Sequence, residues 1–127
     1  MKNLTVQDLD LIHIQIIDAS GGSYDTRDLS RLESAISSIG QEAFNEKLYP
    51  TIFEKAAVIC KGIIADHPFV DGNKRTGIMS ALVFLNLNKI ETKNIQDEVL
   101  EDFAVRIAVQ NLEIPEIAKW FKNNCKH

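Results

Sequence analysis

One stretch near the middle of the chain gathers the side chains that could carry out chemistry. It reads His67-Pro68-Phe69-Val70-Asp71-Gly72-Asn73-Lys74-Arg75-Thr76-Gly77 and combines an imidazole, a carboxylate, a flexible glycine and two cations. An apolar segment, 52–65, precedes it, and another, 78–85, follows it. Together these groups are suited to holding a metal-bound polyphosphate next to a general base.

Three of these residues have a direct chemical use. His67 can accept a proton from an attacking hydroxyl near neutral pH, an effect worth about 10²–10⁴ in rate. Asp71 can bind Mg²⁺, which is often held by one carboxylate and takes its remaining oxygens from water and nucleotide phosphates. Gly72 lets the backbone come close to an anion because no Cβ stands in the way.

The residues around Gly72 could bind the anion and hold the loop. Asn73 is predicted to cap the next helix, which leaves the first amides of that helix free to point at phosphate. Lys74 adds a point charge and Arg75 a bidentate fork. Cations at a helix N-terminus oppose the helix dipole by about 0.3–1 kcal/mol each, so an anion to neutralise would explain them. Phe69 is predicted to anchor the loop by packing against the core.

Each of these residues also has a structural explanation. Asp-Gly-Asn commonly forms a turn before a helix, Pro68 can end the preceding helix, and a Lys-Arg pair usually faces solvent. Residue types and spacing alone therefore predict a phosphate site without a specific reaction. Of the other histidines, His13 lies at helical spacing among apolar residues and is interpreted as a packed or partly buried side chain. His127 ends the chain and is predicted to be disordered.

The elements that must position this stretch are helical. Capping signals and apolar residues at helical spacing predict about six helices: one after the capping pair Thr5 and Asp8, one after Ser30 and Glu33, one opened by Pro50 and continuing through Ile64, one from near Asn73 to about Asn88, one carrying Val99, Phe103 and Ile107, and one opened by Pro115. The 50–64 helix is apolar on nearly all sides and should be central. Only 24–27 and 90–93 carry weak strand signals. The predicted fold is an all-α compact bundle with the motif in a tight connection between two core helices.

Composition narrows the class of protein. The 127 residues are enough to bury roughly two-thirds of the unfolded surface, so 1–127 is interpreted as a single domain. Cys60 and Cys125 lie outside any Cys-x-x-Cys spacing, which indicates free thiols in a reducing compartment. Without a signal peptide or a membrane-length apolar run, a cytoplasmic location and no membrane partner are predicted. The net charge of −4 argues against direct nucleic-acid binding.

The stretch from His67 to Thr76 resembles the signature of the Fic/Doc superfamily, and specifically of its death-on-curing (Doc) branch. The similarity extends to residues 5–22, 32–35, 48–57 and 81–88, so it covers most of the chain. The resemblance implies a Fic/Doc-type helical domain over 1–127 and an ATP- and Mg²⁺-dependent transferase that acts on a protein hydroxyl. In the family's pattern His67 is the general base and Asp71 holds Mg²⁺ on the phosphates, while the anion is cradled by Gly72, Asn73, Lys74 and Arg75.

The sequence departs from the Fic adenylyltransferases, which read Gly-Asn-Gly-Arg with a second arginine three residues after the first. Lys74 replaces the second glycine, and Ile78 occupies the place of the second arginine. In the Doc branch this pattern goes with a reversed ATP, whose γ-phosphate faces the attacking hydroxyl. The resemblance therefore implies a toxin kinase that phosphorylates translation elongation factor Tu and so inhibits translation and growth. Pro68 and Gly72 are closer to the Fic form and keep protein adenylylation as the alternative.

The resemblance also bears on partners. Fic proteins often carry an inhibitory helix with a Ser/Thr-x-x-x-Glu-Gly/Asn motif, but the sequence contains no Glu-Gly or Glu-Asn pair. An inhibitor in trans is therefore expected, a Phd-like antitoxin whose disordered tail folds into a groove on the toxin. The apolar stripe of the first predicted helix is one candidate for that groove. A third hypothesis is a catalytically weak antitoxin-binding co-repressor, against which the intact His67, Asp71 and Lys74 argue.

Overall fold

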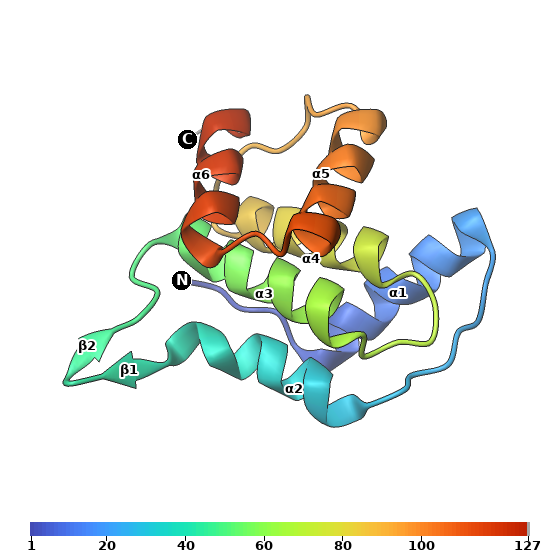
Figure 1. The fold of residues 1–127 in the computed structure, drawn as a ribbon, viewed down its shortest axis with the longest axis horizontal. Helices are drawn as coiled ribbons and strands as arrows, with labels where there is room; N and C mark the ends of the chain where they lie inside the picture. The colour runs from blue at the N-terminus through green and yellow to red at the C-terminus, as the bar shows by residue number, and fades with distance from the viewer. Residues whose placement is uncertain (127) are drawn as a thin grey trace.

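The computed structural model describes residues 1–126, so the prediction for His127 lies outside the described residues. Within that range the chain forms six α-helices, one short 3₁₀ helix and one two-stranded hairpin, which confirms the predicted all-α fold (Figure 1). The elements are α1 Val6–Ser20, α2 Leu29–Ser37, η1 Ser38–Gly40, β1 Glu42–Ala43, β2 Glu46–Lys47, α3 Ile52–Asp66, α4 Asn73–Leu87, α5 Asp97–Gln110 and α6 Ile114–Asn124.

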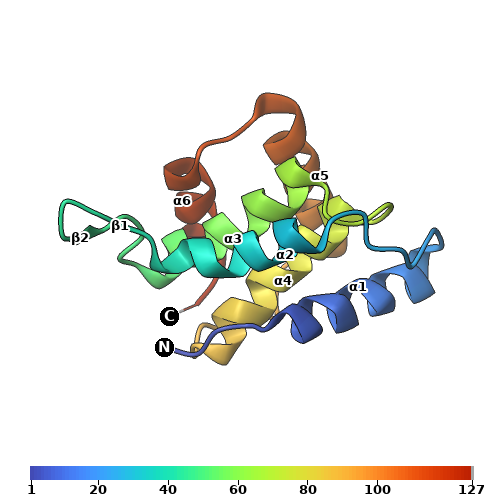
Figure 2. The same cartoon turned by 90° about the horizontal axis from the view of Figure 1, so that it is seen from below.

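The helices α3 and α4 form the centre of the molecule (Figures 1 and 2). As its apolar pattern predicts, α3 is buried over most of its length, and its interior residues are Ala56, Ala57, Val58, Ile59, Cys60, Ile63 and Ile64. The two helices approach closely at Gly77 of α4, where an added Cβ would lie 2.8 Å from Ile64 Cγ1 and 3.0 Å from the Cys60 carbonyl oxygen. This close packing fixes the ends of both helices, which the motif connects.

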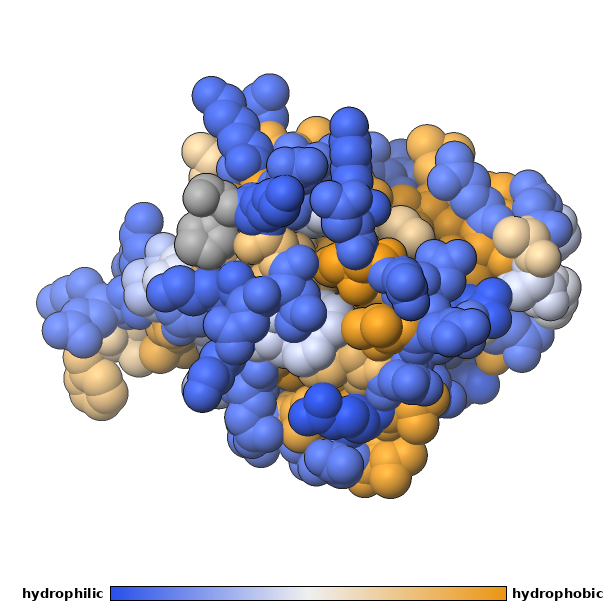
Figure 3. Space-filling view, turned by 90° about the horizontal axis from the view of Figure 1, so that it is seen from above, coloured by the Kyte–Doolittle hydropathy of each residue, from blue (hydrophilic) through white to orange (hydrophobic). Residues whose placement is uncertain are grey.

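The remaining helices cover this central pair. In Figure 1 α2 lies below α3, and α5 and α6 lie above the central pair, while α1 packs against α4. Between α5 and α6, the Phe103 and Trp120 rings stack with centroids 4.0 Å apart, and Phe121 meets both edge-on. Polar side chains cover most of the face that α5 and α6 present to solvent, with apolar patches between them (Figure 3). Within the described residues, no helix combines the length and apolar character that a bilayer crossing requires.

Helix starts follow the predicted signals in part. The capping box of Thr5 and Asp8 is present, and α1 begins where the sequence predicts. The prediction that Ser30 caps the second helix is wrong, because the Asp28 side chain accepts from the Ser30 N–H at 3.0 Å and starts α2 two residues earlier. An aspartate is as good a cap as a serine, and here it stands first in the chain.

The start of α3 also differs from the prediction. Pro50 stands before the helix and does not open it. The cap is Thr51, whose side chain accepts from the Glu54 N–H while the Glu54 carboxylate accepts from the Thr51 N–H. This capping box satisfies two backbone donors at once and outweighs the preference of proline for the first helical position.

Extended structure is limited to short pieces. The weak strand signals at 24–27 and 90–93 correspond to isolated antiparallel bridges, Thr26 with Phe69 and Glu91 with Lys126. The β1–β2 hairpin was not predicted. Its two turn residues, Phe44 and Asn45, both have positive φ (54° and 64°), as a type I′ turn requires, but they lack the Asn-Gly pair that usually signals it.

Candidate active site

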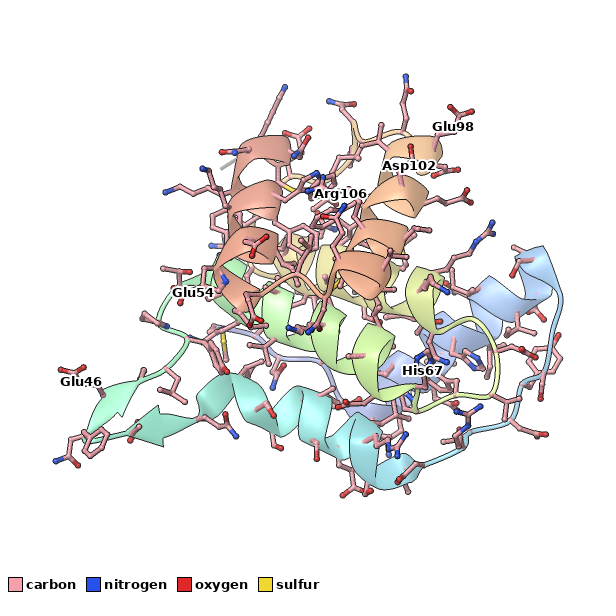
Figure 4. The ribbon with its side chains drawn as sticks, viewed as in Figure 1. Glu46, Glu54, His67, Glu98, Asp102 and Arg106 are labelled. Atoms are coloured by element: carbon pink, nitrogen blue, oxygen red, sulfur yellow. The ribbon has the colours of Figure 1, made fainter. Side chains whose placement is uncertain are left out.

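The motif forms the connection between α3 and α4, where Figure 4 labels His67. His67 follows the last residue of α3, and its N–H donates to the Ile63 carbonyl at 3.2 Å. It has φ 50° and ψ 59°, a left-handed conformation that is unfavourable for a non-glycine residue and further disfavoured before a proline such as Pro68. Its side chain is exposed. A strained backbone therefore presents the imidazole to solvent, and the surrounding contacts must hold it there.

Asn73 closes the loop from inside. Its Oδ1 accepts from the Phe69 N–H at 3.0 Å, and its Nδ2 donates to the Phe69 carbonyl at 2.9 Å. The same Nδ2 lies 3.4 Å from Nδ1 of His67, a long contact at the edge of the imidazole. Because both ends of the amide are engaged in the loop, the prediction that Asn73 caps α4 is wrong. The cap residue is Gly72, with φ 80°, and Asn73 is the first residue of the helix.

The outer side of the loop pairs with the segment that precedes α2. The Pro68 carbonyl accepts from the N–H groups of Arg27 and Asp28 at 2.7 and 3.0 Å. The Val70 N–H donates to the Asp25 carbonyl at 3.1 Å. These bonds make the loop one side of a short irregular ladder. Phe69, for which the sequence predicts a packing role, is fully buried between the loop and the core.

Asp71 is held at its backbone and at its side chain. His13 Nε2 lies 2.8 Å from the Asp71 carbonyl oxygen, and the Ser23 N–H donates to Asp71 Oδ2 at 2.8 Å. The side chain is exposed, and Oδ1 has no partner among the residues that the structure describes. Over the same residues, His, Cys, Asp and Glu form no group of three suited to a metal ion. A single exposed carboxylate with one free oxygen fits Mg²⁺, which keeps waters and phosphate oxygens as its other ligands.

The N-terminus of α4 opens onto the same loop. The first bond within the helix runs from the Thr76 N–H to the Gly72 carbonyl at 2.9 Å, so the amides of residues 73–75 have no acceptor in the helix. Such a helix start is suited to binding an anion. Lys74 is exposed on this first turn. Arg75 instead reaches α5, where its guanidinium lies 2.6 Å from Glu101 Oε1, with both side chains about half exposed.

Two hollows flank the motif. One, of about 230 Å³, lies beside His67 between α3 and α5 and is lined by Lys61, Ile64, Ala65, His67, Ile107, Ala108 and Asn111. The other, of about 150 Å³, lies between α1, α4 and α5 and is lined by Ile16, Arg75, Ile78, Met79, Asp97, Leu100, Glu101 and Ala104. The loop therefore lies between two recesses that a ligand or a partner segment could enter.

Sequence reasoning missed two supports of the site. His13 is buried as its helical spacing predicts, yet its ring nitrogen reaches the motif. A histidine among apolar residues of one stripe is the only signal of this contact in the sequence, and a packed core histidine gives the same signal. The contact of the Ser23 backbone amide could not have been predicted, because every residue except proline carries such a donor.

Comparison with known proteins identifies the family. The model of the Fic/DOC family matches residues 3–85, which include α1 to α3, the motif loop and most of α4. The chain belongs to the Fic/DOC family. Its similarity to curated members of that family extends past the matched region into the C-terminal helices.

Two curated relatives are similar over most of their lengths. A protein of Mycolicibacterium smegmatis named Toxin Doc is 29% identical over 101 residues, which are 79% of this chain and 78% of the relative. A protein of Escherichia phage P1 named Protein kinase doc is 27% identical over 118 residues, which are 93% of this chain and 91% of the relative. Both names belong to the Doc branch that the motif resembles.

Proposed function

We propose that this protein is a Doc-like toxin that transfers the γ-phosphate of ATP to a hydroxyl of a target protein with the help of Mg²⁺. The observation that carries this proposal is the shared position of three groups: an exposed imidazole, an exposed carboxylate and the open N-terminus of α4. The names of the two relatives, a toxin and a protein kinase, support a toxin and a phosphotransferase.

Each group has a role in the proposed reaction. His67 takes the proton of the attacking hydroxyl on the ring nitrogen that carries no hydrogen, the hydroxyl oxygen bonds to the γ-phosphorus, and ADP leaves. Asp71 would hold Mg²⁺ through Oδ1, since Oδ2 is engaged with the Ser23 amide. When bound, Mg²⁺ neutralises charge on the phosphates. The free amides at the start of α4 and the ammonium of Lys74 bind phosphate oxygens. Arg75 binds phosphate as well only if the phosphate replaces Glu101 as the partner of its guanidinium.

The surroundings of Lys74 and Ile78 favour phosphoryl transfer over adenylylation. Ile78 is only 3% exposed, so the place of the second arginine of the adenylyltransferases is filled by a buried apolar side chain. No cation can act from that position on a phosphate. Lys74 stands where the adenylyltransferases have a glycine, and it is exposed on the first turn of α4. Both observations support a γ-phosphate as the transferred group.

The proposed partners are translation elongation factor Tu as the substrate and a Phd-like antitoxin as the inhibitor, both in the cytoplasm. Of the apolar stripe of α1 that the sequence suggested as the antitoxin groove, Leu9, Ile12 and Ile17 are buried within the fold, whereas Ile16 is only half-buried. The 150 Å³ hollow between α1, α4 and α5 is the better candidate. It is lined by Ile16 of that stripe and by further apolar side chains, with Arg75 of the motif and the two acids Asp97 and Glu101 of α5 in its wall.

Label transfer to purified elongation factor Tu tests the reaction. The protein, Mg²⁺ and either γ-labelled or α-labelled ATP are incubated with the target, alongside His67→Ala and the control Lys122→Ala on the exposed side of α6. We expect γ-label on the target with the wild type and Lys122→Ala, and at least a hundredfold less with His67→Ala. Transfer of α-label would establish adenylylation and contradict the argument from Lys74 and Ile78.

A cell-growth assay separates the enzyme from the co-repressor hypothesis. If the protein acts by catalysis, His67→Ala expressed without antitoxin should be harmless while Lys122→Ala remains toxic. If His67→Ala leaves the cellular phenotype as it is with the wild type, the proposed catalytic role of the loop is wrong and the co-repressor hypothesis, which needs no catalysis, is favoured.

A further inference from the structure

We propose that His13 is a positioning residue of this site, whose imidazole holds the turn at Asp71 and Gly72 and so sets the carboxylate of Asp71. The inference deepens the proposed function and rests on it, because it concerns the support of the carboxylate proposed to bind Mg²⁺. It gives α1 a part in the chemistry, although no residue of α1 belongs to the motif.

The burial of His13 is difficult to explain by packing alone. The side chain is 0% exposed on a stripe whose other members, Leu9, Ile12 and Ile17, are apolar. Its Nδ1 is buried and has no hydrogen-bond partner among the residues that the structure describes. An unpartnered buried polar atom is unfavourable, and an apolar residue of similar volume would avoid this penalty. Some other contact of the ring must therefore favour a histidine.

That contact is made with the motif loop. The His13 ring lies flat against Phe69, with centroids 3.7 Å apart and planes within 5° of parallel. Its Nε2 is 2.8 Å from the Asp71 carbonyl oxygen. Because a carbonyl oxygen can only accept a hydrogen bond, Nε2 carries a hydrogen and donates it to Asp71. The imidazole thus stacks on Phe69 with its face and donates a hydrogen bond to the backbone of Asp71 with its edge.

The rest of the contact surface is shaped to fit this turn. A Cβ on Gly72 would lie 3.7 Å from His13 Cδ2 and 3.2 Å from Ile17 Cδ1, so α1 passes directly under the turn. Beyond the end of α1, the Ser23 N–H binds Asp71 Oδ2. A Cβ on Gly22, which has φ 114°, would come within 3.1 Å of Asp71 Cβ. The backbone and the carboxylate of Asp71 are therefore both held by residues 13–23, and a carboxylate fixed in this way needs less ordering when it binds a cation.

Two substitutions at position 13 separate the donor from the packing. His13→Gln keeps an N–H donor at about the reach of Nε2 but loses the flat ring. His13→Phe keeps a flat ring against Phe69 but loses the donor to Asp71. Because the phenylalanine also removes the unpartnered Nδ1, His13→Phe should remain folded, which its thermal unfolding will show. Gly22→Ala is a second variant that displaces the Asp71 side chain without a change in the core.

The readouts are the Mg²⁺ dependence of ATP binding, measured by calorimetry, and NMR of the protein without nucleotide. We expect His13→Phe and Gly22→Ala to weaken Mg²⁺-dependent ATP binding about tenfold to a hundredfold, as loss of a support behind a metal ligand does. His13→Gln should retain most of the wild-type affinity. In the NMR spectra, a slowly exchanging imidazole N–H should be assigned to Nε2 of His13, and the Gly72 and Asn73 amide signals should shift in His13→Phe.

The inference is overturned if His13→Phe binds ATP as the wild type does, or if His13→Gln is impaired as much as His13→Phe. In the second case an N–H donor at position 13 would not preserve the site, so the hydrogen bond to the Asp71 carbonyl would not be what sets the carboxylate. Failure of the proposed function gives a different result. If the wild type transfers no phosphate and binds no ATP, the NMR measurement still decides the role of His13, because unchanged Gly72 and Asn73 signals in His13→Phe would contradict it.

Discussion

At position 67 a histidine adopts a left-handed backbone immediately before Pro68, although glycine would adopt that conformation at lower energy. The side chain is exposed, so burial does not explain its presence. In a sequence without functional demands, this position at the end of a helix would favour glycine. The strain is consistent with the proposed general base, which must stand on a sharp turn to reach solvent from the end of a buried helix.

Replacing His67 by glycine should therefore stabilise the fold while abolishing transfer. We expect His67→Gly to raise the free energy of unfolding by about 1 kcal/mol, because the left-handed conformation is no longer strained. Urea denaturation of the wild type and the variant measures this change. Lys89→Gly is the matched control, since Lys89 also has positive φ (68°) but lies beyond the far end of α4. It should stabilise the fold to a similar extent and leave label transfer intact; a destabilised His67→Gly would contradict the strain argument.

The residues of the motif could be predicted from the sequence because a base, an acid, a glycine and cations are adjacent there. The roles within the motif were less predictable. Asn73 was expected at the cap, yet its amide binds the Phe69 backbone and Gly72 takes the cap position. An asparagine side chain can serve either use, and only the shape of the loop decides between them. The contact of His13 with Asp71 depends on the packing of α1 on α4, which residue spacing does not encode.

At the scale of elements, the approach of α3 to α4 sets the position of both loop ends. Gly77→Ala should place a methyl group 2.8 Å from Ile64 Cγ1 and 3.0 Å from a carbonyl oxygen, closer than atoms tolerate. We expect a loss of about 1–3 kcal/mol in unfolding free energy, because the helices must separate. Gly40→Ala is the control, since an added Cβ there meets nothing within 4 Å. If both variants unfold at the same urea concentration, the close contact does not limit the packing.

The start of α2 makes a prediction about pH. The Ser30 hydroxyl donates to the Asp28 carboxylate and lowers the pKa of that group below its ordinary value. A lowered folded-state pKa contributes stability above the unfolded pKa, about 3.9 for aspartate, and this contribution is lost as the pH falls through the folded pKa. Ser30→Ala should therefore unfold at a lower urea concentration than the wild type at pH 7. The difference between their urea midpoints should become smaller near pH 3.

Ser37→Ala serves as the control for this pH dependence. Ser37 lies at the other end of α2, where its hydroxyl donates to the Ser34 carbonyl, which does not titrate. Any difference between Ser37→Ala and the wild type should be the same at both pH values. A gap for Ser30→Ala that stays constant between pH 7 and pH 3 would show that the charge of Asp28 plays no part at this helix start.

The helices themselves were predictable because apolar periodicity and capping residues are local signals. Errors occurred where two local signals competed within a few residues. Asp28 caps α2 in place of Ser30, which was predicted to do so. Thr51 and Glu54 form the start of α3 in place of Pro50. The hairpin was missed because Phe44 and Asn45 are not typical of the turn they form. Local rules thus find the elements but do not rank neighbouring signals of similar strength.

At the scale of the whole molecule, the candidate site and the hairpin lie at opposite ends of α3. Figure 4 labels His67 at the loop after α3 and Glu46 in the hairpin that precedes α3. The Phe44 side chain at the hairpin turn is fully exposed, and its backbone is in the left-handed region. An exposed aromatic residue in a strained turn contributes nothing to the core. The hairpin should therefore tolerate changes that the loop would not.

A redesigned turn tests this separation of the two ends. The double substitution Phe44→Asn and Asn45→Gly introduces the pair that a type I′ turn prefers, so the free energy of unfolding should rise by about 1 kcal/mol. Label transfer to the target protein should be unchanged, because the hairpin lies at the end of α3 remote from His67, Asp71 and Lys74. Denaturation and transfer are measured on the same preparations. If the variant is more stable but labels its target several times more slowly, while ATP binding is unaffected, then Phe44 contacts the target protein, and its exposure and strain are explained by that contact.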